Sequence, residues 1–123
     1  MEKVHTDLAP AAIGPYSQAW KANGFLFTSG QIAINPKVGK IEAETITEQA
    51  EQVMKNIGEI LKAAGTSYEK TIKTTCFLAD MKDFKAFNEV YAKYFTGKPA
   101  RSCVAVKQLP AGAICEVECI ALL

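Results

Sequence analysis

The pattern of apolar and polar positions predicts two amphipathic helices. From Thr47 to Ala64, apolar residues recur every three or four positions, and Gly65 is suited to end the helix. Either Thr45 or Thr47 can cap its start. A second helix is expected after Asp80, because aromatic residues recur along the segment that ends near 97–99.

Strand-like segments flank both helices. Residues 16–21 and 25–30 surround an Asn-Gly pair, which readily supplies the positive φ angles of a tight hairpin turn. Residues 71–78 are β-branched and alternate apolar with polar side chains, and residues 101–106 and 114–122 provide the last two strands. A loop is expected over 31–44, which show no clear period. The segment around His5 is expected to be loosely held.

This order (β-β-α-β-α-β-β) predicts one α+β domain over residues 1–123, with two helices packed on one face of a mixed sheet. In the last strand, alternate residues from Cys115 to Ala121 point one way. Glu116 and Glu118 point the other way together with the apolar Ile120 and Leu122. Two helices cover only one face, so a partly apolar face is left open, which predicts a homo-oligomer.

Composition and charge limit the possible partners. There are 14 basic and 13 acidic residues, giving a formal net charge of +1, and neither sign forms a long run. A nucleic-acid-binding track is therefore not expected. No stretch approaches the ~18 apolar residues of a membrane span, so a soluble, cytoplasmic protein is predicted. The four cysteines lie in strand-like surroundings and are interpreted as reduced core thiols, with disulfides as the alternative.

Arg101 is the most informative candidate for chemistry. It heads an apolar strand, and Glu116 lies inside the next one. Removing an unpaired ion from water is costly, so either these two side chains pair or Arg101 awaits an anion. The planar guanidinium matches a carboxylate in two parallel hydrogen bonds. Cys103 shares the strand face of Arg101, so an anion held there would lie against the thiol.

Other familiar chemistries find little support. The nearest cysteine pair, Cys115 and Cys119, is separated by about 13 Å in an extended strand, which does not suit zinc. His5 is the single histidine, so a nucleophilic serine or cysteine has no obvious base. Glycine-rich nucleotide-binding motifs are absent.

Several ordered segments, spread over nearly the whole chain, together resemble the RidA/YjgF family of reactive-intermediate deaminases. They are Gly14-Pro15-Tyr16-Ser17-Gln18-Ala19, Phe27-Thr28-Ser29-Gly30-Gln31-Ile32, Leu61-Lys62-Ala63-Ala64-Gly65, Phe87-Asn88 with Tyr91, Pro99-Ala100-Arg101-Ser102-Cys103-Val104, and Leu109-Pro110 with Glu116-Val117-Glu118. The resemblance implies a chorismate-mutase-like fold in a homotrimer, whose sheets form a central barrel with pockets between subunits.

The resemblance also implies an activity. Members hydrolyse 2-imino acids, such as 2-iminobutanoate and 2-iminopropanoate, and their enamine tautomers to 2-oxo acids and ammonia. These substrates are released by pyridoxal-phosphate dehydratases, and no cofactor is implied for the deaminase itself.

The family's site residues map onto this sequence one by one. The carboxylate-binding arginine maps to Arg101 and the water-positioning glutamate to Glu116, which is expected to stay ionised beside an arginine. The remaining pocket residues map to Tyr16, Ser29, Gly30, Asn88 and Cys103. Each also has an ordinary structural interpretation, such as a rim aromatic for Tyr16 or a solvated strand residue for Glu116.

Three alternatives to a deaminase remain open. The same arginine pocket would serve a non-catalytic trimer that binds 2-oxo acids, acts as a sensor or protects other proteins. RNA cleavage has been attributed to family members, but near-neutral charge and a solitary His5 disfavour it here. A mutase-like rearrangement rests on fold alone.

Overall fold

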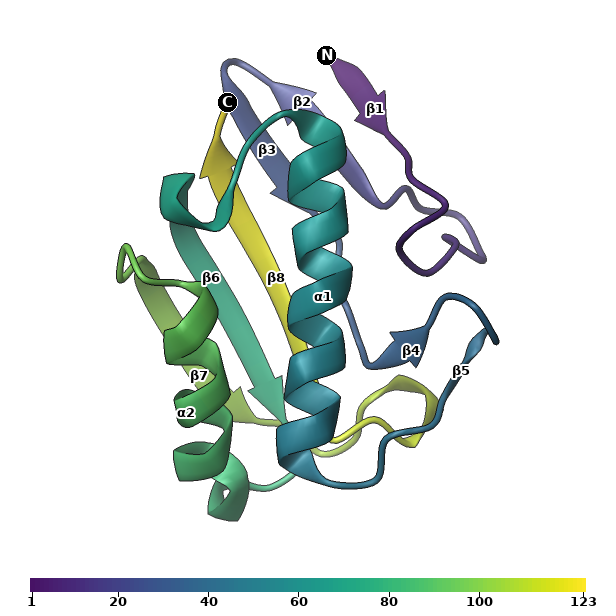
Figure 1. The fold of residues 1–123 in the computed structure, drawn as a ribbon, viewed down its shortest axis with the longest axis vertical. Helices are drawn as coiled ribbons and strands as arrows, with labels where there is room; N and C mark the ends of the chain where they lie inside the picture. The colour runs from purple at the N-terminus through teal and green to yellow at the C-terminus, as the bar shows by residue number, and fades with distance from the viewer.

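A computed structural model describes residues 1–123 and shows a six-stranded sheet with two helices on one of its faces (Figure 1). Across the sheet the strands run in the order β1-β2-β3-β8-β6-β7. β6 and β7 are parallel and all other neighbours are antiparallel, which confirms the predicted mixed sheet. The strands are β1 (Glu2–Val4), β2 (Ala19–Ala22), β3 (Phe25–Thr28), β6 (Thr71–Leu78), β7 (Ala100–Ala105) and β8 (Cys115–Leu122).

The helices are α1 (Ile46–Ala64) and α2 (Phe84–Tyr94), close to the predicted ranges. Thr45 caps α1, because its hydroxyl accepts from the Glu48 backbone N–H, and Gly65 ends it in a left-handed conformation. Short 3₁₀ segments span Tyr68–Lys70, Met81–Asp83 and Pro110–Gly112. Neither α-helix is long and apolar enough to cross a membrane.

The core fills the space between the helices and the covered face of the sheet. β8 contributes the alternate residues Cys115, Val117, Cys119 and Ala121, all of which are buried, as predicted. From α1, apolar residues such as Met54 and Ile57 pack against them. All four cysteines are free thiols; Cys76, Cys115 and Cys119 are buried in the core, as predicted, whereas Cys103 is half-buried.

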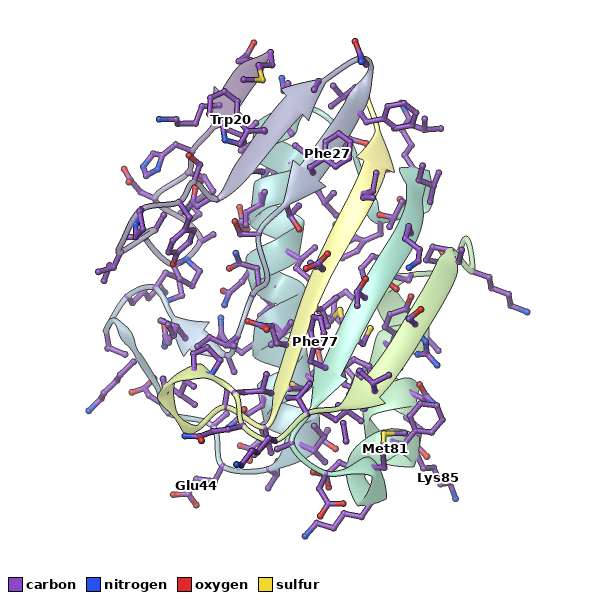
Figure 2. The ribbon with its side chains drawn as sticks, turned by 180° about the vertical axis from the view of Figure 1, so that it is seen from behind. Trp20, Phe27, Glu44, Phe77, Met81 and Lys85 are labelled. Atoms are coloured by element: carbon purple, nitrogen blue, oxygen red, sulfur yellow. The ribbon has the colours of Figure 1, made fainter.

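The opposite face of the sheet is uncovered and partly apolar. Figure 2 shows Trp20, Phe27 and Phe77 on this side. Trp20 and Phe27 are cross-strand neighbours that remain 37% and 44% exposed, and Leu122 remains 44% exposed. The prediction of a sheet with one covered and one open apolar face is therefore confirmed.

Three details of the prediction are wrong. The N-terminal segment is not loose, because Glu2–Val4 pairs with β2 as an edge strand. The expected loop over 31–44 contains a small hairpin of β4 (Ile34–Asn35) and β5 (Lys40–Ile41), whose turn is closed by hydrogen bonds to Asn35. β2 begins at Ala19 rather than residue 16, because the preceding residues form a loop.

Candidate active site

Arg101 lies on the edge strand β7, with its side chain half-buried against α2. Its Nη1 donates a 2.7 Å hydrogen bond to the Oδ1 of Asn88. The guanidinium carbon stands 4.8 Å from the ring centroid of Tyr91 and 5.5 Å from that of Phe84. No acidic side chain forms an ion pair with it. Arg101 is therefore oriented by an amide and two rings while its charge stays unpaired.

The Tyr91 ring is itself held in place. Its hydroxyl and the Thr74 hydroxyl of β6 share a hydrogen bond of 2.7 Å in the buried layer. The ring also packs at 4.8 Å from the Phe95 ring and 5.9 Å from the Phe87 ring. Arg101 thus rests on a rigid aromatic surface rather than on a flexible side chain.

A cavity of about 360 Å³ lies beside this guanidinium, and we call it the Arg101 pocket. Its second cationic residue is the exposed Lys98, and it contains no acidic residue. A small anion would therefore meet only positive charge there. The pocket is lined by Asn88, Tyr91, Ala92, Phe95, Thr96, Lys98, Pro99 and Arg101.

A second cavity of about 480 Å³ contains Glu116, and we call it the Glu116 pocket. Glu116 is its only charged residue, and Tyr16, 52% exposed, stands on its wall. Four of the seven predicted site residues meet here: Tyr16, Ser29, Gly30 and Glu116. The lining residues are Pro10, Ala11, Ile13, Tyr16, Gln18, Ser29, Gly30, Gln31, Ile32, Ile34, Pro110 and Glu116.

The position of Glu116 is set by the backbone pairing of its neighbour, Val117. Gln31 forms an isolated bridge with Val117, with backbone hydrogen bonds of 2.8 and 3.1 Å, and this brings Gly30 beside Glu116. Burial raises the pKa of Glu116 above its usual range, and the charge of Glu118 raises it further. A carboxylate with a raised pKa is a stronger proton acceptor once ionised.

Buried amide side chains hold the loops that wall the Glu116 pocket. Gln18 is 2% exposed, accepts from the Thr6 backbone N–H at 2.8 Å, and donates to the carbonyl oxygens of Thr6, Ala9 and Pro10. Asn56 of α1 donates to the carbonyl oxygens of Ile32 and Ile34. One wall residue, Gln18, and one helix residue outside the pocket, Asn56, therefore fix the shape of this pocket.

Arg101 and Glu116 do not pair within one chain. Arg101 faces α2 on the covered side of the sheet, whereas Glu116 alternates with buried Cys115 and Val117 and points to the open side. Burial and the charge of Glu118 raise the pKa of Glu116, and no arginine contributes to this shift. The expectation that a neighbouring arginine keeps Glu116 ionised is therefore not met within the single chain.

Cys103 shares the face of Arg101, as predicted, and is paired in register with Cys76 of β6. Its thiol is half-buried, and burial raises its pKa although the nearby Arg101 charge lowers it. A largely protonated thiol is a poor nucleophile, so Cys103 does not suit covalent chemistry, and it lines neither pocket.

Sequence reasoning missed three residues that shape the two pockets: Gln18, Phe84 and Tyr91. Gln18 and Tyr91 lie inside the quoted family segments, so a signal was present, but an aromatic residue in a helix or a polar residue in a loop has no distinctive spacing. Their roles depend on contacts with residues distant in sequence, namely Arg101 for the aromatic pair and Thr6 for Gln18.

Comparisons with known proteins agree with this architecture. The family model described as Endoribonuclease L-PSP matches residues 6–123. Reactive Intermediate Deaminase A, chloroplastic, from Arabidopsis thaliana is 54% identical over 123 residues, and the alignment covers 99% of this chain and 66% of that protein. The 2-iminobutanoate/2-iminopropanoate deaminase of Mus musculus is 47% identical over 120 residues, covering 97% of this chain and 89% of that protein.

Solved structures show the same fold. RidA from an Antarctic Psychrobacter superposes with a TM-score of 0.95 at 38% identity, covering 100% of both chains. TdcF of E. coli, solved with bound serine, superposes with a TM-score of 0.94 at 40% identity, covering 100% of this chain and 99% of that chain. The matches run the length of the chain and include its mixed sheet and both helices, and the chain therefore belongs to the RidA/YjgF family of reactive-intermediate deaminases.

Proposed function

We propose that this protein is a hydrolytic deaminase that converts small 2-imino acids and their enamine tautomers, such as 2-iminobutanoate and 2-iminopropanoate, to 2-oxo acids and ammonia. The observation that carries the proposal is a guanidinium without a counter-charge, stacked on Tyr91 and Phe84. The relatives named as imine deaminases support the same chemistry.

The proposed reaction needs a positioned carboxylate, a water molecule and one proton acceptor. Arg101 holds the substrate carboxylate through two parallel hydrogen bonds. Glu116 accepts a proton from water as the water oxygen bonds to C2 of the iminium, giving a carbinolamine. Glu116 passes this proton to the nitrogen. The C2–N bond then breaks while Glu116 takes the hydroxyl proton of the carbinolamine, so ammonia leaves, C2 becomes the carbonyl of the 2-oxo acid, and the remaining proton is released to water. An iminium carbon is already electrophilic, so orientation and proton transfer suffice.

We propose further that the complete site forms between subunits of a homotrimer. In one chain Arg101 and Glu116 point to opposite sides of the sheet, so a second copy is the simplest source of the missing partner. The open apolar face and the unpaired edge of β7 provide surfaces for such an assembly. Asn88 and Cys103 would come with Arg101, while Tyr16, Ser29 and Gly30 would come with Glu116.

The experiment that tests the activity uses a chemical trap. An amino-acid oxidase or a threonine dehydratase generates the imine, semicarbazide captures what survives, and the purified protein is added in increasing amounts. Hydrolysis by the protein lowers the trapped fraction, and Glu116→Gln lowers the rate by ~10²- to 10⁴-fold, the usual contribution of a proton-transfer group. An unchanged trapped fraction would remove the deaminase proposal.

The alternative is a non-catalytic trimer that binds 2-oxo acids as a sensor or protective module. Calorimetric titration with 2-oxobutanoate separates the two functions. Binding that depends on Arg101, together with an unchanged trapped fraction, favours the binding module. A proposed place downstream of pyridoxal-phosphate dehydratases follows from the instability of their imine products.

A further inference from the structure

Gly30 occupies a position whose backbone does not require glycine. Its φ angle lies outside the left-handed region, unlike that of Gly14, Gly24 and other glycines of the chain. An L-amino acid would therefore meet no positive-φ strain at this position. Another reason must account for the missing side chain.

Space supplies that reason. A Cβ atom on Gly30 would stand 2.9 Å from the Glu116 Cδ, 3.0 Å from its Oε1 and 3.1 Å from its Cγ. Carbon atoms attract one another best at about 3.5–4.0 Å, so these separations are repulsive. The carboxyl group of Glu116 fills the volume that any side chain at Gly30 would need.

The backbone around Gly30 is tied down on both sides. The Ser29 N–H donates to the Gln18 carbonyl at 2.9 Å, and the Gln31 N–H donates to the Val117 carbonyl at 2.8 Å. Val117, the neighbour of Glu116, returns a hydrogen bond to the Gln31 carbonyl at 3.1 Å. A methyl group at Gly30 would therefore displace the flexible end of Glu116, which opens onto the pocket, rather than either backbone.

We propose that Gly30 is a positioning residue, whose lack of a side chain fixes where the Glu116 carboxylate stands and hence the direction from which water reaches the substrate. The inference rests on the proposed deaminase function for its catalytic meaning. The proposed role belongs to the missing side chain of Gly30 and is separate from any hydrogen bond of its backbone.

The size of the effect follows from the distances. Relieving a 2.9 Å contact moves the carboxyl by roughly 0.5–1 Å, and a misplacement of about 1 Å costs up to ~10²-fold in rate. Gly30→Ala should therefore fold normally and lower kcat by about 10- to 100-fold. KM should change little, because Arg101 still holds the substrate carboxylate.

The test compares Gly30→Ala, Glu116→Ala and the double variant in the trapping assay. Alanine at residue 116 lacks the Cγ, Cδ and Oε1 atoms that the new methyl group would contact. Gly30→Ala should therefore cost much less of the residual rate in the Glu116→Ala background than it costs in the wild type. An equal cost in both backgrounds would overturn the inference. Gly58→Ala is the matched control, because its new Cβ collides with the Tyr68 hydroxyl and neither residue lines the Glu116 pocket. It should lower the melting temperature and leave kcat and the pH profile unchanged.

A second readout does not need activity. Carbon-13 NMR of labelled glutamate follows the Glu116 titration, assigned by its loss in Glu116→Gln. Burial raises this pKa within one chain. Gly30→Ala, measured in the Arg101→Ala background to remove the cation of a neighbouring subunit, should lower it by moving the carboxyl toward the pocket opening. An unchanged titration would overturn the inference. If the wild type hydrolyses no imine, the proposed function fails, and the titration still decides the role of Gly30.

Discussion

The Arg101 pocket and the Glu116 pocket are built by opposite means. The first is a rigid surface of aromatic rings on which an unpaired cation is stacked. The second is a cavity between loops, which buried amides hold against the sheet around one carboxyl group. Each pocket contains the charge that the other lacks. This is the difference that the proposed shared site requires, with substrate binding assigned to the first pocket and water activation to the second.

The largest expected effect comes from removing the cation. Arg101→Ala loses two charge-assisted hydrogen bonds of ~1.5–3 kcal/mol each, so kcat/KM should fall by about 10²- to 10⁴-fold. Arg101→Lys keeps the charge but loses the planar fork, so it should recover only part of the loss. Lys85→Ala removes an exposed cation of α2 and is the control (Figure 2). Equal activity in Arg101→Ala and wild type would remove Arg101 from the mechanism.

Mixing two inactive variants tests whether the halves come from different chains. Arg101→Ala subunits retain Glu116, and Glu116→Gln subunits retain Arg101. After dissociation and random reassembly, about a quarter of the interfaces in a cyclic oligomer carry both native residues. Activity should therefore rise from near zero to about a quarter of the wild-type value. No recovery, with mixed oligomers confirmed by native mass spectrometry, would contradict a site shared between subunits.

Removing the side-chain hydrogen bonds of Gln18 should increase the mobility of the loops around the Glu116 pocket and leave α2 unaffected. Gln18→Met fills the space but leaves the Thr6 N–H and three carbonyl groups without their partner, at ~1–3 kcal/mol for each unsatisfied group. Hydrogen exchange at the Thr6 amide should accelerate by at least about 30-fold, while amides of α2 stay protected. Gln108→Met, at an exposed position, is the control. Uniform loss of protection would show that Gln18 stabilises the whole fold instead.

A smaller effect is expected from the aromatic surface. Phe84→Leu keeps an apolar contact but removes one ring below Arg101, and such a contact contributes ~0.5–1 kcal/mol. The affinity for 2-oxobutanoate should fall by about 2- to 5-fold with little change in kcat. A fall in kcat without a fall in affinity would place Phe84 in the chemical step rather than in binding.

The two pockets also differ in how much of them the sequence could predict. Periodicity located α1, α2 and β8 within a few residues, because each pattern reflects burial of one face. Family segments supplied Arg101 and Glu116, but their separation in one chain depends on strand direction and side-chain alternation across the sheet. The hydrogen bonds of Gln18 could not be predicted either, because their acceptors belong to a loop that has no periodic pattern.

The smallest expected effect is that of Glu116→Gln on thermal stability. This effect should differ between a protein in which Arg101 of a neighbouring subunit reaches Glu116 and one in which it does not. Burial raises the pKa of Glu116 in the folded chain above its value in the unfolded chain. The contribution of the protonated carboxyl to the stability of the fold is therefore complete below the pKa of the unfolded chain, and it is lost as pH rises through the pKa of the folded chain. At neutral pH, Glu116→Gln should therefore raise Tm by about 1–2 °C in the Arg101→Ala background, and the gain should vanish under acidic conditions. In the native background, Arg101 of a neighbouring subunit would stabilise the carboxylate, so the gain should shrink or change sign. Thermal unfolding of the four variants at neutral and acidic pH measures this coupling. The same gain in both backgrounds would mean that the cation and the carboxylate never meet.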